Sequence, residues 1–254
     1  MTFPNTKDKH LYDPFFSPDD YIKYIRENNL LPDFKIPKGV LFVYSKKLQD
    51  KIIGSNEVEK IDLFKGDFFI LKDSGIGVLN IGIGAPAIVT AMEELIALGT
   101  SKFFSIGTAG GLQKSLKLAD IIVCDKAIRD EGVSHHYLEP SKYIETSENL
   151  TNIFCNELDK QGLEFKKGST WTIDAPYRET VQELKEYQAE GVMTVDMEAS
   201  ALASVAKLRK VEFATAFVVS DLLGELVWNP QFKIPAVLEN LQKIAESAIK
   251  ILSK

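Results

Sequence analysis

The sequence predicts an α/β protein with a largely parallel or mixed, twisted sheet flanked by helices, organised as one domain over residues 1–254. Two observations lead to this prediction: short apolar runs alternate with longer segments of helical periodicity, and glycine-rich turns follow several of these runs. A chain of 254 residues is long enough to bury one substantial core. Because ligands of such sheets collect beyond the carboxyl ends of the strands, we expect a functional site at those turns.

The composition narrows the classes of partner. The net charge is −6 and the pI is about 5.3, with no basic stripe, so nucleic acid is not expected as a partner. Cys124 and Cys155 belong to no CxxC or Cys/His cluster, so neither a zinc site nor a disulfide framework is expected. The start of the chain has no signal-peptide pattern, and no apolar run approaches the ~20 residues of a membrane span. We therefore expect a cytoplasmic protein without a metal.

The elements of the first half are predicted in order. An N-terminal arm and helix occupy residues 1–35, and Ser17 before Pro18 marks the start of the helix as an N-cap followed by proline. Apolar runs then predict strands at 40–44, 68–71 and 78–83.

The second half continues the alternation. Strands are predicted at 103–106, 121–124 and 213–219. Helical periodicity predicts helices at 86–99, 148–160, 178–187, 196–208 and in a long final segment whose apolar stripe runs from Val237 to Leu252.

Two glycine-rich turns are the first candidate site. Gly82-Ile83-Gly84 resembles half a dinucleotide fingerprint, but Ala87 stands where the third glycine belongs, so a nicotinamide site is not expected. The glycines could simply permit tight turns. Alternatively, the backbone N–H groups near Gly84 and the hydroxyl of Thr108 could line a pocket for an anion or a sugar.

Asp196, Met197 and Glu198 form the second candidate. One interpretation is that these acidic residues at a helix start only stabilise the helix dipole. Carboxylates are also the natural acceptors for the neighbouring 2′ and 3′ hydroxyls of a ribose, and a thioether packs on the apolar face of the sugar.

Asp221 follows a buried strand and is the third candidate. It could cap the next segment. It could also act as a general acid, because cleavage of an N-glycosidic bond leaves electron density on the base that a proton must neutralise.

Two further segments carry polar and aromatic side chains. His135 and His136 are adjacent, so on a strand they would point in different directions and would not share a metal. Trp171 could be a core residue or could stack on a base, with Tyr177 or Arg178 bonding the edge of that base.

In combination, these segments resemble the trimeric and hexameric branch of the nucleoside phosphorylase family, which includes purine nucleoside phosphorylases, uridine phosphorylases and nucleosidases. The resemblance runs from about residue 40 to the C-terminus and depends on the order of 82–86, 107–111, 196–198 and 220–221. It implies a phosphorylase-like single domain that binds a nucleoside. It also implies a homo-oligomer with active sites at a dimer interface and no cofactor other than phosphate as co-substrate.

The resemblance also implies roles for individual residues. Glu198 and Met197 would hold the ribose, Asp221 would face the base, and Thr108 would lie where ribose meets phosphate. Trp171 would stack on the base, and His10 of a neighbouring subunit would cover the 5′ hydroxyl.

The expected phosphate pocket departs from the family pattern. Tyr44 replaces a glycine, Leu48 stands near an expected arginine, and Ser105 replaces another arginine. Lys46 and Lys47 could compensate only as point charges. Three functions therefore stay open: ribosyl transfer to phosphate in nucleoside salvage, hydrolysis of the nucleoside by water, and nucleoside binding without turnover.

Overall fold

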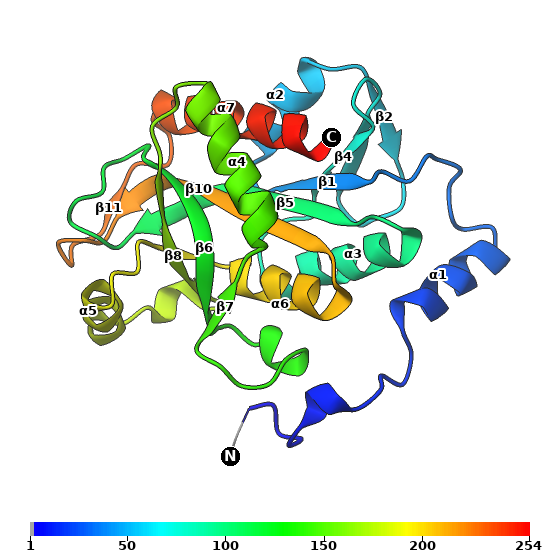
Figure 1. Ribbon diagram of the computed structural model, residues 1–254, viewed down its shortest axis with the longest axis horizontal. Coiled ribbons are helices and arrows are strands. Elements are labelled where there is room, and N and C mark those ends of the chain that lie inside the picture. The colour runs from blue at the N-terminus through cyan, green and yellow to red at the C-terminus, as the bar shows by residue number, and fades with distance from the viewer. Residues whose placement is uncertain (1–2) are drawn as a thin grey trace.

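The computed structural model describes residues 3–254 as helices packed on both faces of a mixed sheet (Figure 1). The strands are β1 Gly39–Val43, β2 Val58–Ile61, β3 Asp67–Leu71, β4 Ile76–Asn80, β5 Lys102–Gly111, β6 Ile121–Asp130, β7 Tyr143–Glu145, β8 Lys166–Ile173, β9 Thr194–Asp196, β10 Glu212–Leu222 and β11 Asn229–Pro230. The helices are α1 Pro18–Glu27, α2 Lys46–Gly54, α3 Ala85–Leu98, α4 Glu148–Lys160, α5 Val181–Ala189, α6 Ala199–Arg209 and α7 Pro235–Leu252. Short 3-10 turns are η1 Lys9–Leu11, η2 Ser134–His136 and η3 Pro176–Arg178.

The sheet confirms the predicted α/β class. Its strand order is β11-β10-β6-β8-β9-β5-β1-β4-β3-β2, with β7 beside β6. A further pairing of β10 with β5 closes a circuit through β5, β10, β6, β8 and β9. Two buried apolar clusters lie on opposite faces of the sheet, one under α3 and α6 and the other under α2, α4 and α7.

Parallel pairing brings the glycine-rich turns to one edge. Strands β4, β1, β5 and β10 run parallel to one another, so their carboxyl ends lie on the same side. The register of β10 on β5 sets Asp221 beside Gly110, and the register of β9 on β5 sets Val195 beside the same glycine. Segments far apart in sequence therefore meet around the end of β5, where a ligand site is expected.

Local sequence signals explain the helix ends. Ser17 and Asp20 form a reciprocal capping box at the start of α1. Gly84, at φ 115°, begins α3 and Gly99, also at φ 115°, ends it. Both positions lie in the left-handed half of φ space that favours glycine.

Several elements differ from the sequence predictions. Helix α2 begins directly after Tyr44, where an anion-binding loop was expected. The edge strand β2 was missed because its sequence, VEKI, has no apolar run. His135 and His136 lie in the 3-10 turn η2 rather than on a strand, because Ser134 and its neighbours form a tight turn held by Glu131.

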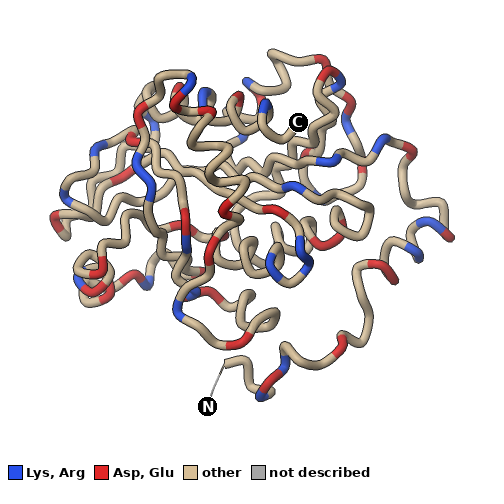
Figure 2. The backbone as a smooth tube through the Cα atoms, in the orientation of Figure 1, with Lys and Arg blue, Asp and Glu red and all other residues tan. Residues whose placement is uncertain are grey.

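Charged residues of both signs are mixed along the whole backbone (Figure 2). Among the helices of residues 3–254, none has the length and apolar character needed to cross a membrane.

Candidate nucleoside site

The site lies where β4, β5, β9 and β10 end. Gly84 follows β4, Thr108 is an exposed residue within the otherwise buried end of β5, and Glu198 links β9 to α6. The backbone N–H of Gly84 donates to Oε1 of Glu198 at 2.6 Å. This contact joins two of the predicted segments, which are 114 residues apart in sequence.

Asp196 is saturated by protein donors. Its Oδ1 accepts from the hydroxyls of Thr170 at 3.1 Å and Thr172 at 2.7 Å. Its Oδ2 accepts from the backbone N–H groups of Glu198 at 2.8 Å and Ala199 at 2.7 Å. The predicted contact of Asp196 with substrate is therefore not what the structure supports: this carboxylate faces the protein, where it caps α6 and fixes the turn that carries Glu198.

Glu198 is the second buried carboxyl at these strand ends, and its Oε1 accepts from the Gly84 N–H. Its side chain is 6% exposed, and burial, followed by the charge of Asp196, raises the pKa of Glu198 to about 8. The Gly84 N–H counteracts part of this increase. At neutral pH, the Glu198 carboxyl therefore holds its proton most of the time in the ligand-free protein. The preceding Met197 is partly buried beside it.

The expected phosphate pocket is filled by Tyr44. A Cβ atom placed on Gly107 would lie 2.9 Å from Cδ2 of Tyr44, so the ring packs directly against the glycine of β5. The Tyr44 hydroxyl is buried and has no hydrogen-bond partner among residues 3–254. Burial, followed by the charges of Glu198 and Asp196, raises the pKa of Tyr44.

The other candidate phosphate ligands are also engaged elsewhere. Ser105 donates from Oγ to the Thr215 hydroxyl at 2.7 Å, within the sheet. Lys46 forms ion pairs with Asp67 at 2.9 Å and Asp50 at 3.2 Å. Lys47 is exposed on the first turn of α2, and Leu48, at 0% exposed, is part of the core. The residues of this pocket therefore present no guanidinium fork to an anion.

Asp221 lies near the carboxyl end of β10 and is 9% exposed. Its Oδ1 accepts from the hydroxyl of Ser220 at 2.8 Å, and its Oδ2 accepts from the indole N–H of Trp228 at 3.0 Å. The sequence analysis did not single out Trp228. The available signal was a tryptophan seven positions after the candidate acid.

Trp171 is a core residue, and its predicted stacking on a base is wrong. Its ring is 0% exposed, lies 4.9 Å from the ring of Tyr187, and donates its indole N–H to Asp130 at 2.8 Å. Tyr177 is 98% exposed, and Arg178 is also exposed, in the turn η3 that follows β8.

Glu179 is a second acidic group near Asp221, and no sequence pattern pointed to it. Burial is the largest cause that raises the pKa of Glu179 to about 7, and the charges of Asp221 and Glu183 add to it. Two carboxyl groups whose charges repel therefore lie near each other at this end of β10.

The N-terminal arm packs on the loop after β6. Lys9 bonds Nδ1 of His136 at 2.8 Å, and the ring of Phe3 meets those of His135 and His136. His10 is partly buried in η1 within this arm. Its predicted role over the 5′ hydroxyl of a neighbouring subunit stays a prediction.

Arg129 and Glu131 organise the loop that receives the arm. Arg129 is 5% exposed and donates to Ser134 and to the carbonyl of Glu139. Glu131 accepts from the hydroxyl of Ser200 at 2.9 Å, which ties the loop to α6. Both side chains are structural in this arrangement.

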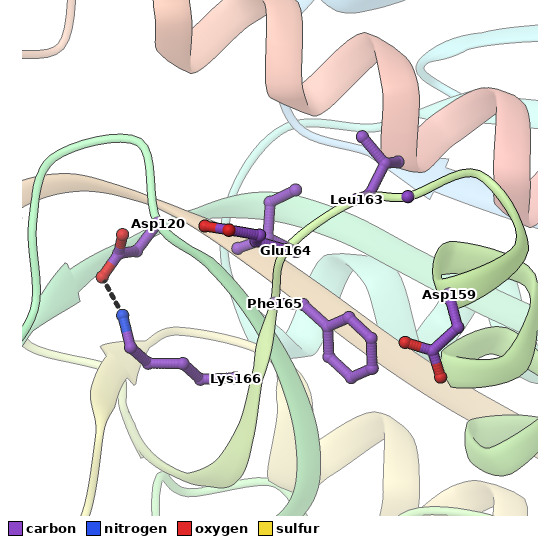
Figure 3. A pocket seen from close by; sticks show the side chains of 8 residues that line it. Asp120, Asp159, Leu163, Glu164, Phe165 and Lys166 are labelled. Atoms are coloured by element: carbon purple, nitrogen blue, oxygen red, sulfur yellow. Dashed lines mark hydrogen bonds and ion pairs between the residues drawn. The ribbon is translucent and has the colours of Figure 1, made fainter.

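A separate cavity lies away from these residues. It has a volume of ≈ 510 Å³ and opens beside β8, where Asp120 pairs with Lys166 and where Leu163 and Phe165 are among the lining residues (Figure 3). Within the described part of the chain, no group of three or more His, Cys, Asp or Glu side chains is arranged to hold a metal ion.

The fold and the site define a class of protein. The sequence profile of the phosphorylase superfamily matches residues 48–252, and the chain belongs to this superfamily. A DeoD-type purine nucleoside phosphorylase from Exiguobacterium sp. strain AT1b is 29% identical over 175 residues, which cover 67% of this chain and 72% of the relative.

Two solved structures share the fold. Uridine phosphorylase from Vibrio fischeri ES114 superposes with a TM-score of 0.75 at 23% identity, covering 86% of this chain and 92% of that one. Purine nucleoside phosphorylase from Toxoplasma gondii, solved in complex with immucillin-H, gives a TM-score of 0.77 at 21% identity with the same coverages.

Proposed function

We propose that the protein cleaves the N-glycosidic bond of a purine or uridine nucleoside and transfers the ribosyl group to phosphate. The observation that carries this proposal is the buried carboxyl of Glu198, held by the Gly84 N–H at the same strand ends as Asp221. The relatives are named for phosphorolysis of purine nucleosides or uridine, which supports the same chemistry.

In this proposal, Glu198 and Met197 act on the ribose of the nucleoside, and Asp221 acts on its base. Glu198 binds the ribose hydroxyls, and Met197 packs on the sugar. As the bond from C1′ to the base nitrogen breaks, its electron pair moves to the base, which Asp221 stabilises by hydrogen bonding or by donating a proton. A phosphate oxygen then forms the new bond to C1′, which gives ribose 1-phosphate and free base.

We further propose that the protein is a homo-oligomer in the cytoplasm. The N-terminal arm leaves apolar side chains exposed: Leu11 at 73%, Tyr12 at 66%, Phe15 at 103% and Phe16 at 71%. Such a surface supports a homo-oligomer in which the arm contacts a second copy, with His10 reaching a neighbouring site. We place the protein in nucleoside salvage in the cytoplasm, which suits its free Cys124 and Cys155.

Hydrolysis is a second candidate function because of one observation. Tyr44 fills the space under Gly107, and Ser105 bonds Thr215, so neutral, protein-bonded groups occupy the expected anion pocket. Charge-assisted contacts to phosphate are worth ~1.5–3 kcal/mol each, so the absence of several of them would weaken phosphate binding. Water would then be the acceptor, and the products would be ribose and free base.

The test follows the release of base from inosine, adenosine and uridine with and without phosphate. Release that rises with phosphate, with ribose 1-phosphate as the product, supports phosphorolysis. Equal release without phosphate supports hydrolysis. Nucleoside-dependent thermal stabilisation without release shows binding without turnover and refutes both proposals. Asp221→Asn tests the base-side assignment: full activity of this variant on purine nucleosides contradicts the role of Asp221.

A further inference from the structure

The segment after Asp221 folds back over the end of β10. Strand β11 pairs antiparallel with β10, which sets Asp221 opposite Pro230 and Leu222 opposite Asn229. The backbone N–H of Gln231 donates to the carbonyl of Ser220 at 3.0 Å. This return of the chain brings Trp228 back to the candidate acid.

Trp228 makes a directed contact without being a core residue. Its indole N–H donates to Oδ2 of Asp221 at 3.0 Å while its side chain stays 62% exposed. A hydrogen bond to a carboxylate is charge-assisted, so it is stronger and more directional than a neutral one. Trp171 offers the contrast, because it bonds Asp130 in the same way but is 0% exposed and packs in the core.

Two donors on two oxygens fix the plane of the Asp221 carboxyl. Ser220 donates to Oδ1 at 2.8 Å and Trp228 to Oδ2, so rotation of the group breaks at least one hydrogen bond. Ser220 is adjacent in sequence and moves with Asp221, whereas Trp228 approaches from a separate segment. The orientation of the carboxyl relative to the rest of the site therefore depends on Trp228.

We propose that Trp228 is a positioning residue that holds the Asp221 carboxyl toward the base of the bound nucleoside. This inference rests on the proposed function, because it assigns Trp228 a role only through Asp221. A misoriented acid loses much of its rate advantage, since proton transfer needs a short and aligned hydrogen bond. Trp228 therefore affects the chemical step more than the binding of the sugar.

The kinetic experiment is a double-mutant cycle. Trp228→Phe keeps an aromatic ring but removes the N–H donor, and we expect it to lower kcat about fivefold with little change in KM for the nucleoside. In an Asp221→Ala background, the same substitution should change kcat less than about twofold, because no carboxyl remains to position. Val227→Ala, in the same exposed segment, is the matched control and should behave as wild type.

Equal losses in both backgrounds, or a rise in KM with kcat unchanged, would overturn the proposal, because Trp228 would then act on the substrate or on the fold directly. No change of kcat in Trp228→Phe would overturn it as well.

A readout that does not depend on turnover tests the contact itself. The chain has two tryptophans, so its ¹⁵N–¹H spectrum contains two indole signals. Asp221→Ala should shift the Trp228 indole signal and leave that of Trp171 in place, since Trp171 bonds Asp130. An unmoved Trp228 signal refutes the contact. If wild-type protein releases no base from any nucleoside, the proposed function fails, and the indole signals still decide whether Trp228 holds Asp221.

Discussion

Glu198→Gln should make the protein more stable at neutral and alkaline pH while removing the carboxyl that we propose binds the ribose. The pKa of Glu198 rises from an ordinary 4.5 to about 8, mainly through burial. Between these two values, the folded state binds more protons than the unfolded state, so the stability of the wild type falls as pH rises. Glutamine is neutral, has nearly the same shape and can still accept the Gly84 N–H, so it avoids this loss.

The magnitude follows from the width of the pH window. Each pH unit between 4.5 and about 8 costs the wild type about 1.4 kcal/mol, and the loss levels off above pH 8. The variant should therefore exceed the free energy of unfolding of the wild type by less than about 1 kcal/mol at pH 5 and by about 3 kcal/mol at pH 7. For a chain of this size, that difference raises Tm by about 6–12 °C.

The assay is urea unfolding of both proteins at intervals from pH 5 to pH 9, with Glu239→Gln as the control. Glu239 is exposed on α7, so its variant should follow the wild type at every pH. A constant difference between Glu198→Gln and the wild type across the whole range would refute the reasoning, because a pKa-linked penalty must grow with pH.

The remaining predictions concern Tyr44, Thr172 and the ion pair between Arg209 and the buried Glu93. Tyr44→Phe removes a buried hydroxyl that has no partner, so it should raise the free energy of unfolding by about 1 kcal/mol in urea titrations, and a loss of stability would reveal a partner for that hydroxyl. Thr172→Val removes the donor to Asp196 and the acceptor for the Ser200 N–H, so we expect a loss of about 2 kcal/mol and a higher KM for the nucleoside. Thr172→Ser keeps both bonds and should restore most of the affinity, and equal defects in the two variants would contradict the hydrogen-bonding role. Arg209→Leu leaves the buried Glu93 without its two hydrogen bonds between α6 and α3, so Tm should fall by an amount equivalent to about 3 kcal/mol, whereas an unchanged Tm would show that the pair adds nothing.

Much of the fold was predictable because its signals are local. Ser17, Pro18 and Asp20 mark the start of α1 by capping chemistry that involves only neighbouring residues. Gly84 and Gly99 bound α3 for the same kind of reason. Helix α2 and the strands β2, β7, β8, β9 and β11 were not predicted. Of these, β2 lies at the edge of the sheet and needs no apolar run, and β9 is a three-residue strand whose partners β5 and β8 are distant in sequence.

The sequence predicted that the candidate residues lie at strand ends, which the structure confirms, but it could not decide the orientation of their side chains. Asp196 and Glu198 are two positions apart and have the same charge. Only Asp196 meets Thr170 and Thr172 from β8, so it faces the protein while Glu198 faces Gly84. That difference depends on the pairing of β8 with β9, which joins residues more than twenty positions apart in the sequence.

The roles of the two tryptophans also could not be decided from the sequence. Trp171 could be core or stacking, and its place beside Asp130 and Tyr187 makes it core. Trp228 had no assigned role until the register of β11 on β10 brought it to Asp221.

The sequence by itself determined the α/β class, the family and the strand ends at which Gly84, Thr108, Glu198 and Asp221 lie, because short-range patterns encode these features. Only the tertiary structure decided that Asp196 bonds protein donors while Glu198 accepts from Gly84, that Tyr44 packs against Gly107, and which tryptophan bonds Asp221. The physical reason is that burial, hydrogen-bond saturation and raised pKa values arise from contacts between distant segments, and no local pattern specifies those contacts.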